Sequence, residues 1–255
     1  MPYDQEIYNQ RLTAEEFKLL SKYIHENVGI KMPREKKSML EGRLRKRIRH
    51  LGLGSFNQYI DYVFSPRGME DEMAHMIDVV TTNKTDFFRE PHHFEYLVKE
   101  GLPKLITAQG AGVRRCLMVW SAGCSTGEEA YSIAMALNEF GRQHPGLGFE
   151  FRILATDIST QVLDTARRAV YTEEKVEPVP MDLRKKYLLK SKDSSRQLVR
   201  VIPSLRGSVK FRRLNFLEQD FGFRERMDIV FFRNVMIYFD KPTQEKILRK
   251  VTEYM

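Results

Sequence analysis

Two glycines and two glutamates lie in a short loop of this sequence, and their spacing limits the ligands that the loop can bind. The stretch "VWSAGCSTGEEAYSIAMAL" passes from an apolar run into a helix-like one through residues 123–129. Gly123 and Gly127 permit close approach of the main chain to a ligand. The loop contains no lysine, so it is not a Walker loop, and its G-x-x-x-G spacing is not the dinucleotide pattern. An acidic loop of this kind favours a ligand with hydroxyl groups and a positive charge.

Glu129 has two interpretations. Thr126 and Glu129 have the spacing of a capping box, in which the glutamate serves the N-terminus of the following helix. Alternatively, the Glu129 carboxylate binds the ligand. The loop alone leaves both interpretations open.

Polar side chains also follow three further strand-like segments. The segment "FRILATD" ends at Asp157, where an acidic residue commonly holds ribose hydroxyls; its alternative role is to cap the next helix. The segments "RRLNF" and "FFRNVMIYF" place Asn215 and Asn234 just past a strand, and an asparagine amide both donates and accepts hydrogen bonds. Ligands of open α/β sheets bind at the carboxyl ends of the strands. Together these residues predict an S-adenosylmethionine site rather than a nicotinamide site.

The elements that position these residues follow an alternating pattern. From residue 92 onward, apolar strand-like runs alternate with helix-like runs, which predicts a doubly wound parallel sheet over residues 92–255. Between about residues 171 and 207 the pattern breaks into a polar, proline-containing stretch with short strand-like pieces. We expect a small inserted antiparallel β subdomain there.

The first third of the chain predicts a separate helical domain over residues 1–80. Thr13 and Glu16 form a capping-box pattern before "FKLLSKYIHENVG", and three more helix-like stretches follow. We expect residues 81–91 to form a linker that contributes to the cofactor site. His92 and His93 are adjacent, but they are expected on different sides of a helix, and no further ligand cluster accompanies them. The sequence therefore predicts no metal site.

One helix of this domain is unusually basic. Residues 34–49 hold eight basic and two acidic residues, while Leu40, Leu44 and Ile48 form one apolar stripe. A solvated face is one explanation, and a docking surface for an acidic partner is the other. The docking hypothesis names Arg43, Arg45, Lys46, Arg47 and Arg49.

Composition narrows the class of protein. Hydrophobic residues make up 42% of the 255 residues and charged residues 30%, which is typical of a globular protein. The net charge of +8 indicates an acidic partner: nucleic acid, a membrane or an acidic protein. No apolar run approaches the length of a membrane span, and "MPYDQEIYNQ" does not have the pattern of a signal peptide. Cys116 and Cys124 are too few for a disulfide framework. These features predict a cytoplasmic location without membrane insertion.

Four long motifs resemble those of one known family. "TTNKTDFFRE", "VWSAGCSTGEEAYSIAMAL", "ATDIS" and "FFRNVMIYFDKPTQEKILRK" are similar to motifs of the chemotaxis receptor methyltransferases, the CheR-type family, and the resemblance covers nearly the whole chain. It implies a Rossmann-like S-adenosylmethionine-dependent methyltransferase domain that methylates receptor glutamates to methyl esters and releases S-adenosylhomocysteine. The cofactor-binding residues implied by the resemblance are Asn83, Thr85, Arg89, Ala122, Gly123, Glu129, Asp157, Asn215, Phe216, Asn234 and Val235.

The resemblance also implies the catalytic residues of a protein-glutamate O-methyltransferase. A glutamate is almost wholly ionised at neutral pH, so its carboxylate is already a nucleophile and no general base is required. Arg89 and Tyr238 match positions implied to act in catalysis, Arg89 by orienting a carboxylate and Tyr238 by donating a hydrogen bond. The alternatives are a surface charge for Arg89 and a core aromatic for Tyr238.

The expected partners are the glutamate-rich cytoplasmic helices of a chemoreceptor. The 171–207 insert resembles a subdomain that grips a receptor's C-terminal peptide in some family members, although "LLKSKDSSRQLVRV" lacks glycines at its turn. We expect a monomer that binds no nucleic acid. Two rival functions are a nucleic-acid methyltransferase, whose Asn/Asp-Pro-Pro-aromatic loop is replaced here by "RNVMIY", and a non-catalytic adaptor. The adaptor reading arises because family members continue into two further strands beyond the helix that reaches Met255.

Overall fold

The computed structural model describes residues 10–81 and 83–255, which form two compact units. Among the described residues, unit 1 comprises residues 10–81, 215–219 and 236–248. Unit 2 comprises residues 83–214, 220–235 and 249–255. The N-terminal stretch considered as a signal peptide lies outside the described residues except for Gln10, as does Thr82 of the predicted linker.

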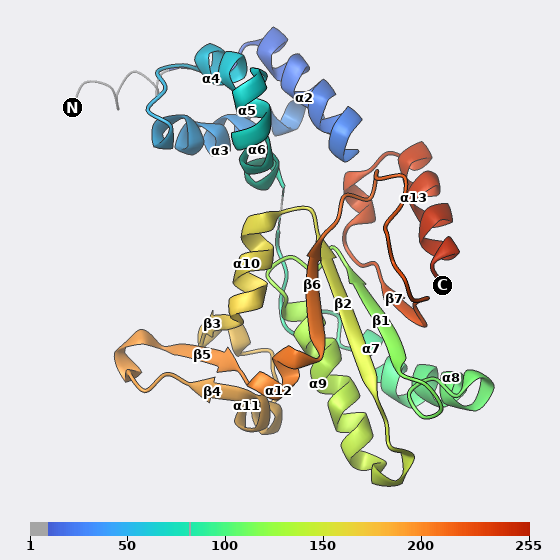
Figure 1. Cartoon of the computed structure of the whole chain (residues 1–255). Helices are drawn as coiled ribbons and strands as arrows, with labels where there is room; N and C mark the ends of the chain where they lie inside the picture. The colour runs from blue at the N-terminus through green and yellow to red at the C-terminus, as the bar shows by residue number, and fades with distance from the viewer. Residues whose placement is uncertain (1–9, 82) are drawn as a thin grey trace. The chain divides into compact units, whose positions relative to one another are not determined.

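Unit 1 is built from helices whose starts are encoded locally (Figure 1). The capping box predicted at its first helix is confirmed, because Thr13 Oγ1 accepts from Glu16 N at 3.1 Å and Thr13 N donates to Glu16 Oε2 at 2.7 Å. Ser55 and Ser65 cap two later helices through the serine side chain alone, which accepts from Gln58 N and Gly68 N. The helices are α2 (Ala14–Val28), η1 (Arg34–Lys36), α3 (Lys37–His50), α4 (Phe56–Val63), α5 (Pro66–Asp71) and α6 (Met73–Val80).

The apolar stripe of α3 lies in the core of unit 1, as predicted. Leu40, Leu44 and Ile48 are completely buried. Beside them, the Arg47 guanidinium forms two hydrogen bonds with the Glu72 carboxylate, at 2.8 and 2.6 Å. The Tyr59 hydroxyl donates to the same carboxylate at 3.1 Å, and Glu72 is 1% exposed. A buried carboxylate is tolerated only when paired and hydrogen-bonded, as it is here.

Two segments from the second half of the sequence also belong to unit 1. Asn215 Nδ2 donates to the carbonyl of Asn27 at the end of α2, at 2.7 Å. The main-chain N–H of Lys31 donates to the carbonyl of Tyr238 at 2.8 Å. Tyr238 lies in η6 (Met236–Tyr238), and the following helix α13 (Lys241–Glu253) begins in unit 1 and ends in unit 2.

Unit 2 contains a parallel four-stranded sheet in the order β6-β2-β1-β7, with α9 and α10 packed against it (Figure 1). Val119 pairs with Ile153 on one side and with Ile229 on the other. The chain moves outward from β1 through β2 to β6 and then returns to the other side of β1. This reversal creates a topological switch point at the carboxyl end of β1. The strands are β1 (Leu117–Ala122), β2 (Phe151–Asp157), β6 (Val209–Arg213) and β7 (Ile229–Phe231).

The predicted α/β methyltransferase-type fold and its inserted antiparallel sheet are confirmed. The insert is a three-stranded sheet in the order β3-β5-β4, with both pairs antiparallel. Its strands are β3 (Val170–Thr172), β4 (Leu188–Lys190) and β5 (Leu198–Val201). The remaining elements of unit 2 are α7 (His92–Tyr96), η2 (Leu97–Gly101), α8 (Leu102–Gln109), α9 (Glu128–Gln143), η3 (Pro145–Leu147), α10 (Thr160–Arg168), η4 (Glu174–Val176), α11 (Met181–Tyr187), η5 (Ser194–Arg196) and α12 (Pro203–Gly207).

No helix within residues 10–81 or 83–255 combines the length and apolar composition needed to cross a membrane. The domain limits predicted from the sequence stay predictions.

The buried ion pair of unit 1 gives a first testable prediction. Arg47→Met leaves the Glu72 carboxylate buried without its cation, so we expect the free energy of unfolding to fall by about 3–5 kcal/mol. Urea unfolding followed by circular dichroism measures the change. Lys46→Met, at an exposed neighbouring position, should change it by no more than about 0.5 kcal/mol. An unchanged urea midpoint for Arg47→Met would show that the pair does not stabilise the unit.

Candidate functional site

The loop between β1 and α9 makes a sharp turn at the switch point of unit 2. The N–H groups of Gly123 and Cys124 both donate to the Thr156 carbonyl of β2, at 2.8 and 2.9 Å. Gly123 has a φ of 81°, and a Cβ there would lie 2.4 Å from Cγ2 of Val235. Gly127 has a φ of 96°, and a Cβ there would lie 2.9 Å from that of Ala166. These glycines therefore admit close protein neighbours, and not only a ligand as the sequence suggested.

The capping-box interpretation of Glu129 is wrong. Helix α9 begins at Glu128 with Gly127 as its N-cap residue, and no side chain caps it. The Thr126 hydroxyl instead donates to Glu128 Oε2 at 2.6 Å. The left-handed conformation of Gly127 delays the start of the helix by one residue, which breaks the Thr126–Glu129 spacing.

Glu129 points back toward the end of β1. Its Oε1 accepts a hydrogen bond from the Ser121 hydroxyl at 2.7 Å, and its Oε2 lies 3.4 Å from Nη1 of Arg233. Burial raises the pKa of the Glu129 carboxyl to about 7, while Ser121 and Arg233 oppose the shift. This carboxylate therefore changes charge within the physiological range.

Asp157 holds the loop from the end of β2. Its Oδ2 accepts from the N–H of Ser125 at 2.8 Å, and its Oδ1 accepts from the N–H of Ser159 at 3.0 Å. The N-cap of α10 is Ser159, whose hydroxyl accepts from Val162 N at 3.3 Å. Asp157 thus supports the turn before α10 without being its cap residue.

Arg233 was not predicted from the sequence, although it connects several predicted residues. Its side chain is 11% exposed and donates to the carbonyl of Arg89. Its Nη2 lies 3.3 Å from Glu90 Oε2, its Nη1 lies 3.4 Å from Glu129 Oε2, and its guanidinium lies over the ring of Phe94. Among the described residues, its buried Nε has no hydrogen-bond partner. The only sequence signal was its position directly before Asn234.

Backbone strain gathers at the same place. Six non-glycine residues in the described chain have positive φ, and four of them are Phe88, Glu90, Ser125 and Asn234. Asn234 Nδ2 lies 3.5 Å from Glu90 Oε1, which places two of these residues side by side. Strained backbone of this kind is found preferentially at functional sites.

The predicted site residues divide between the two units. Within unit 2 the structure brings Gly123 against Val235, and Asn234 and Arg89 against Glu90. Arg89 also donates to the Lys84 carbonyl at 3.2 Å. Within unit 1 the predicted residues are Asn215, Phe216 and Tyr238.

The unit 1 residues have protein contacts of their own. Phe216 is buried and packs edge-on against Phe239, with ring centroids 6.4 Å apart. Tyr238 is half-buried, not a core aromatic, and Lys36 Nζ lies 5.5 Å from its ring centroid.

The prediction that His92 and His93 lie on different sides of a helix without a further ligand nearby is wrong. The two imidazole rings lie together, 4.2 Å apart, and ligand atoms of both histidines and Glu90 lie within 4.8 Å of one another. However, the Arg233 guanidinium already occupies Glu90 and places a positive charge beside any cation. The absence of a metal stays a prediction.

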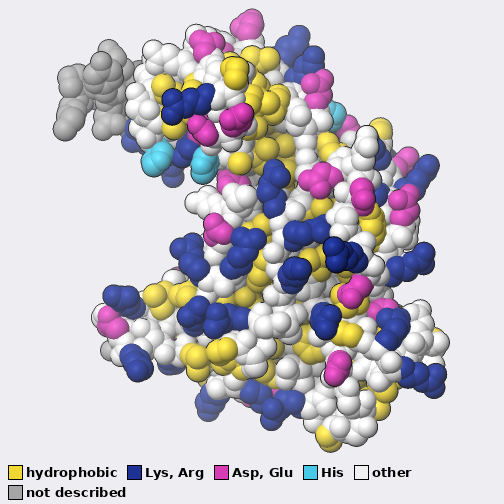
Figure 2. All heavy atoms as spheres, viewed as in Figure 1, with side chains coloured by type: hydrophobic (Ala, Val, Ile, Leu, Met, Phe, Trp, Pro, Cys, Tyr) yellow, Lys and Arg dark blue, Asp and Glu magenta, His cyan; other side chains and the backbone are white. Residues whose placement is uncertain are grey.

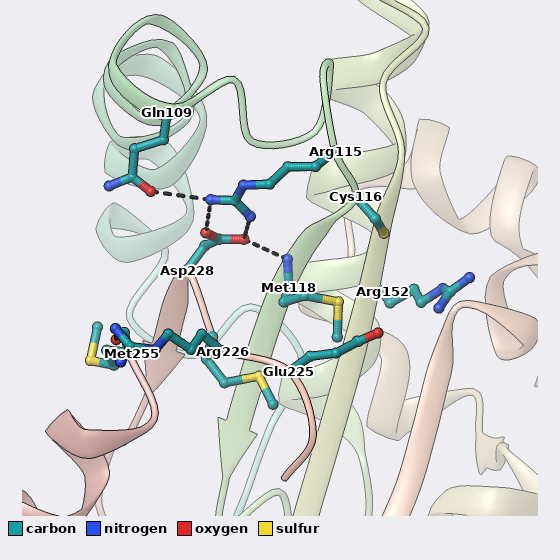
Figure 3. A pocket seen from close by; sticks show the side chains of 10 residues that line it. Gln109, Arg115, Cys116, Met118, Arg152, Glu225, Arg226, Asp228 and Met255 are labelled. Carbon is teal, nitrogen blue, oxygen red and sulfur yellow. Dashed lines mark hydrogen bonds and ion pairs between the residues drawn. The ribbon is translucent and has the colours of Figure 1, made fainter.

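A cavity of about 740 Å³ lies at the opposite, amino edge of the sheet (Figure 3). Arg115 and Asp228 form a bidentate ion pair there, and Asp228 accepts from the N–H of Met118 at 2.8 Å. None of the predicted site residues lines this cavity, so it is separate from the candidate site. It is lined by Gln109, Arg115, Cys116, Met118, Arg152, Glu225, Arg226, Met227, Asp228 and Met255.

The five basic residues predicted to dock a partner differ in their availability. Arg43 donates to the carbonyls of residues 79–81 at the end of α6. Arg45 donates to the carbonyl of Gln10 at 2.7 Å, and Arg47 is held in its pair with Glu72. These three arginines stabilise unit 1 itself. Lys46 is exposed and Arg49 is half-buried.

Comparison with known proteins identifies the family. The family model for the "CheR methyltransferase, SAM binding domain" matches residues 83–255, and that for the "CheR methyltransferase, all-alpha domain" matches residues 15–81. The chain belongs to the CheR methyltransferase family. The resemblance inferred from the four sequence motifs is thereby confirmed.

Relatives in the CheR family match over most of their length. A chemotaxis protein methyltransferase of Borreliella burgdorferi is 36% identical over 97% of this chain and 86% of its own. Chemotaxis protein methyltransferase 2 of Pseudomonas aeruginosa is 39% identical over 94% of this chain and 81% of its own. The Escherichia coli chemotaxis protein methyltransferase is 36% identical over 94% and 79%. These matches assign the chain to a family of methyltransferases whose catalytic domain binds S-adenosylmethionine.

The raised pKa of Glu129 predicts pH-dependent cofactor binding. An ionised carboxylate accepts hydrogen bonds from ribose hydroxyls more strongly than a protonated one, and Glu129 ionises as pH rises through about 7. We expect S-adenosylhomocysteine to bind roughly tenfold more tightly at pH 8 than at pH 6, measured by calorimetry. Glu129→Gln should bind more weakly and without this dependence.

Two variants complete that experiment. Because Arg233 favours the ionised form of Glu129, Arg233→Gln should move the midpoint to higher pH. Asp164→Asn, at an exposed carboxylate on α10, should leave the profile unchanged. A wild-type affinity that is constant between pH 6 and 8, together with wild-type affinity in Glu129→Gln, would exclude Glu129 from cofactor binding.

Proposed function

We propose that this protein transfers a methyl group from S-adenosylmethionine to glutamate side chains of a chemoreceptor, as a protein-glutamate O-methyltransferase. The observation that carries the proposal is the match of both CheR domains along the chain, with relatives that are named chemotaxis protein methyltransferases. The strained, acidic carboxyl edge of unit 2 supports it, because polar groups there converge where Rossmann-like folds bind ligands.

The residues of unit 2 fit such a cofactor chemically. Glu129 and Asp157 supply carboxylates suited to ribose hydroxyls. The buried Arg233 Nε is a donor available within the same cluster. The roles of Ala122, Asn215, Phe216 and Val235 in cofactor binding rest on the family resemblance.

When bound, S-adenosylmethionine supplies a methyl group activated by a sulfonium, and transfer to a carboxylate oxygen breaks the carbon–sulfur bond and leaves two neutral products. Because opposite charges are neutralised, no proton has to move and no general base is needed. The protein has to orient the substrate carboxylate and exclude water. Arg89 would orient the carboxylate with its planar guanidinium. Tyr238 would donate a hydrogen bond, a role that rests on the resemblance.

The reaction is tested with radiolabelled S-adenosylmethionine and the cytoplasmic fragment of a chemoreceptor. Label that is released as methanol in mild alkali identifies a methyl ester, whereas methylated amines keep the label. A receptor fragment whose methylatable glutamates are changed to alanine serves as the control. Cofactor binding without transfer to any glutamate would favour an adaptor instead.

Arg89→Ala tests the positioning of the carboxylate. Loss of a charge-assisted hydrogen bond, about 1.5–3 kcal/mol, should lower kcat/KM for the receptor fragment by roughly 10–100-fold. Arg142→Ala, at an exposed arginine of α9, is the matched control and should have little effect. Unchanged turnover in Arg89→Ala would remove Arg89 from the mechanism.

The basic helix α3 is proposed to meet glutamate-rich receptor helices. Basic side chains are not confined to α3, because Figure 2 also shows lysines and arginines over unit 2 and its inserted sheet. A test of α3 therefore reverses one exposed charge on that helix and compares receptor binding with that of a variant carrying the same charge reversal on another helix. A receptor tail peptide at the 171–207 insert and a monomeric state are further parts of the proposal.

Lys46→Glu should weaken receptor binding several-fold at low ionic strength. The loss should shrink in 0.5 M salt, because screening shortens the reach of exposed charges to a few ångströms. Lys18→Glu makes the same charge change at an exposed position of α2. Surface plasmon resonance of both variants on receptor fragments measures the difference. An equal loss of receptor affinity in the two variants would show that binding depends only on the net charge of the protein and not on α3.

A further inference from the structure

Residues 83–90, called here the site segment, are held by contacts along their whole length. Near the start, the Ser125 hydroxyl donates to the Asn83 carbonyl at 3.0 Å. Farther along, the N–H of Phe88 donates to the Ser132 hydroxyl at 2.9 Å. At the end, Arg233 holds the last two residues, as described above. These contacts come from the loop after β1, from α9 and from the stretch after β7, which all belong to the parallel-sheet core of unit 2.

The middle of the site segment is held from the inserted subdomain by Lys175. This residue lies in η4, directly after β3, and its ammonium donates to the carbonyl of Thr85. It also donates to Asp86 Oδ1 at 2.8 Å. A second carboxylate, that of Glu128 at the first residue of α9, lies 3.7 Å from the ammonium through Oε1 and forms an ion pair with it. The ammonium thus hydrogen-bonds two groups of the site segment and pairs by charge with the start of α9.

The environment of Glu128 explains why a cation is needed there. Glu128 is 1% exposed, and burial raises its pKa, while the Thr126 hydroxyl and Lys175 act in the opposite direction. Glu128 directly follows Gly127, where the loop turns, and its carboxylate accepts from the Thr126 hydroxyl of that loop. The Lys175 ammonium therefore offsets the negative charge of Glu128 and also binds Thr85 and Asp86 of the site segment.

A second contact from the insert supports the same arrangement. Tyr171 on β3 is buried, and its hydroxyl donates to the carbonyl of Thr126 at 2.7 Å. Its ring packs edge-on against Phe87 of the site segment, with centroids 5.0 Å apart. This apolar contact places the segment, whereas Lys175 fixes the main-chain direction at Thr85. The side chain of Lys175 is 36% exposed, so it is not itself part of the core.

We infer that Lys175 is a positioning residue for cofactor binding, which it serves by fixing Thr85 and Asp86 of the site segment from the inserted subdomain. The inference rests on the proposed function in one respect, namely that Asn83, Thr85 and Arg89 of this segment contact S-adenosylmethionine. It gives the insert a part in forming the cofactor site, in addition to any part in binding a receptor.

The test compares Lys175→Met, Lys175→Arg and Lys186→Met in the full chain. Lys186 is a matched control because it lies in the same insert, is 35% exposed and pairs with the Glu139 carboxylate at 2.7 Å, away from the site segment. Two quantities are measured: the Kd for S-adenosylhomocysteine by calorimetry, and hydrogen exchange of the peptide that covers residues 83–90. Where the wild type is active on the receptor fragment, KM for S-adenosylmethionine and kcat are added.

For Lys175→Met we expect a three- to tenfold higher Kd and KM, an unchanged kcat, and faster exchange of residues 83–90. Lys175→Arg should recover most of the affinity, and Lys186→Met should match the wild type. Wild-type affinity and exchange in Lys175→Met would overturn the inference, as would an equal loss in Lys186→Met. A wild-type chain that binds no S-adenosylhomocysteine would overturn the cofactor proposal, and with it the cofactor-positioning role; faster exchange in Lys175→Met would then support only the structural contact.

Discussion

The candidate site of unit 2 depends on one buried guanidinium. Arg233 is held between the Arg89 carbonyl and the carboxylates of Glu90 and Glu129, so it connects a segment before α7 with the first turn of α9. Without a cation, the largely buried Glu129 carboxylate and the more exposed Glu90 carboxylate would lie near each other with like charges that repel. The strained conformations of Phe88, Glu90 and Asn234 gather around the same group. The positive charge of Arg233 therefore permits a ligand site lined by carboxylates to form at the partly buried carboxyl edge of the sheet.

In the loop after β1, the sequence predicted the positions of the site residues but not their hydrogen-bond partners. Alternating strands and helices predicted the parallel sheet, because buried strands need helical crossovers to pair in parallel. The positions of Glu129 and Asp157 followed from strand ends. Their hydrogen-bond partners did not, since the Thr126–Glu129 spacing fits a capping box equally well. The left-handed turn at Gly127 excludes the capping box and leaves Glu129 free to contact Ser121 and Arg233. This turn packs closely against Ala166, which lies in a helix distant in sequence.

Long-range contacts account for what the sequence did not reveal. Arg233 and Lys175 gave no local signal, because each donates hydrogen bonds to acceptors more than 80 residues away along the chain. Similarly, a helical wheel of α3 separates apolar from basic positions but does not show which arginines have internal acceptors. Arg43 and Arg47 are bound to a helix end and a buried carboxylate, and the exposed positive charge of the helix is smaller than its composition suggests.

The make-up of unit 1 has a consequence for biosynthesis. Its N-terminal helices are joined by residues 215–219 and 236–248, through contacts such as Asn215 with Asn27 and His25 with Asp240. During translation these helices emerge from the ribosome long before their last partners are made. The unit cannot complete its contacts until nearly the whole chain described here has been synthesised. Its helices must therefore wait in a partly assembled state, where nascent-chain chaperones and proteases have access to surfaces that the finished protein covers.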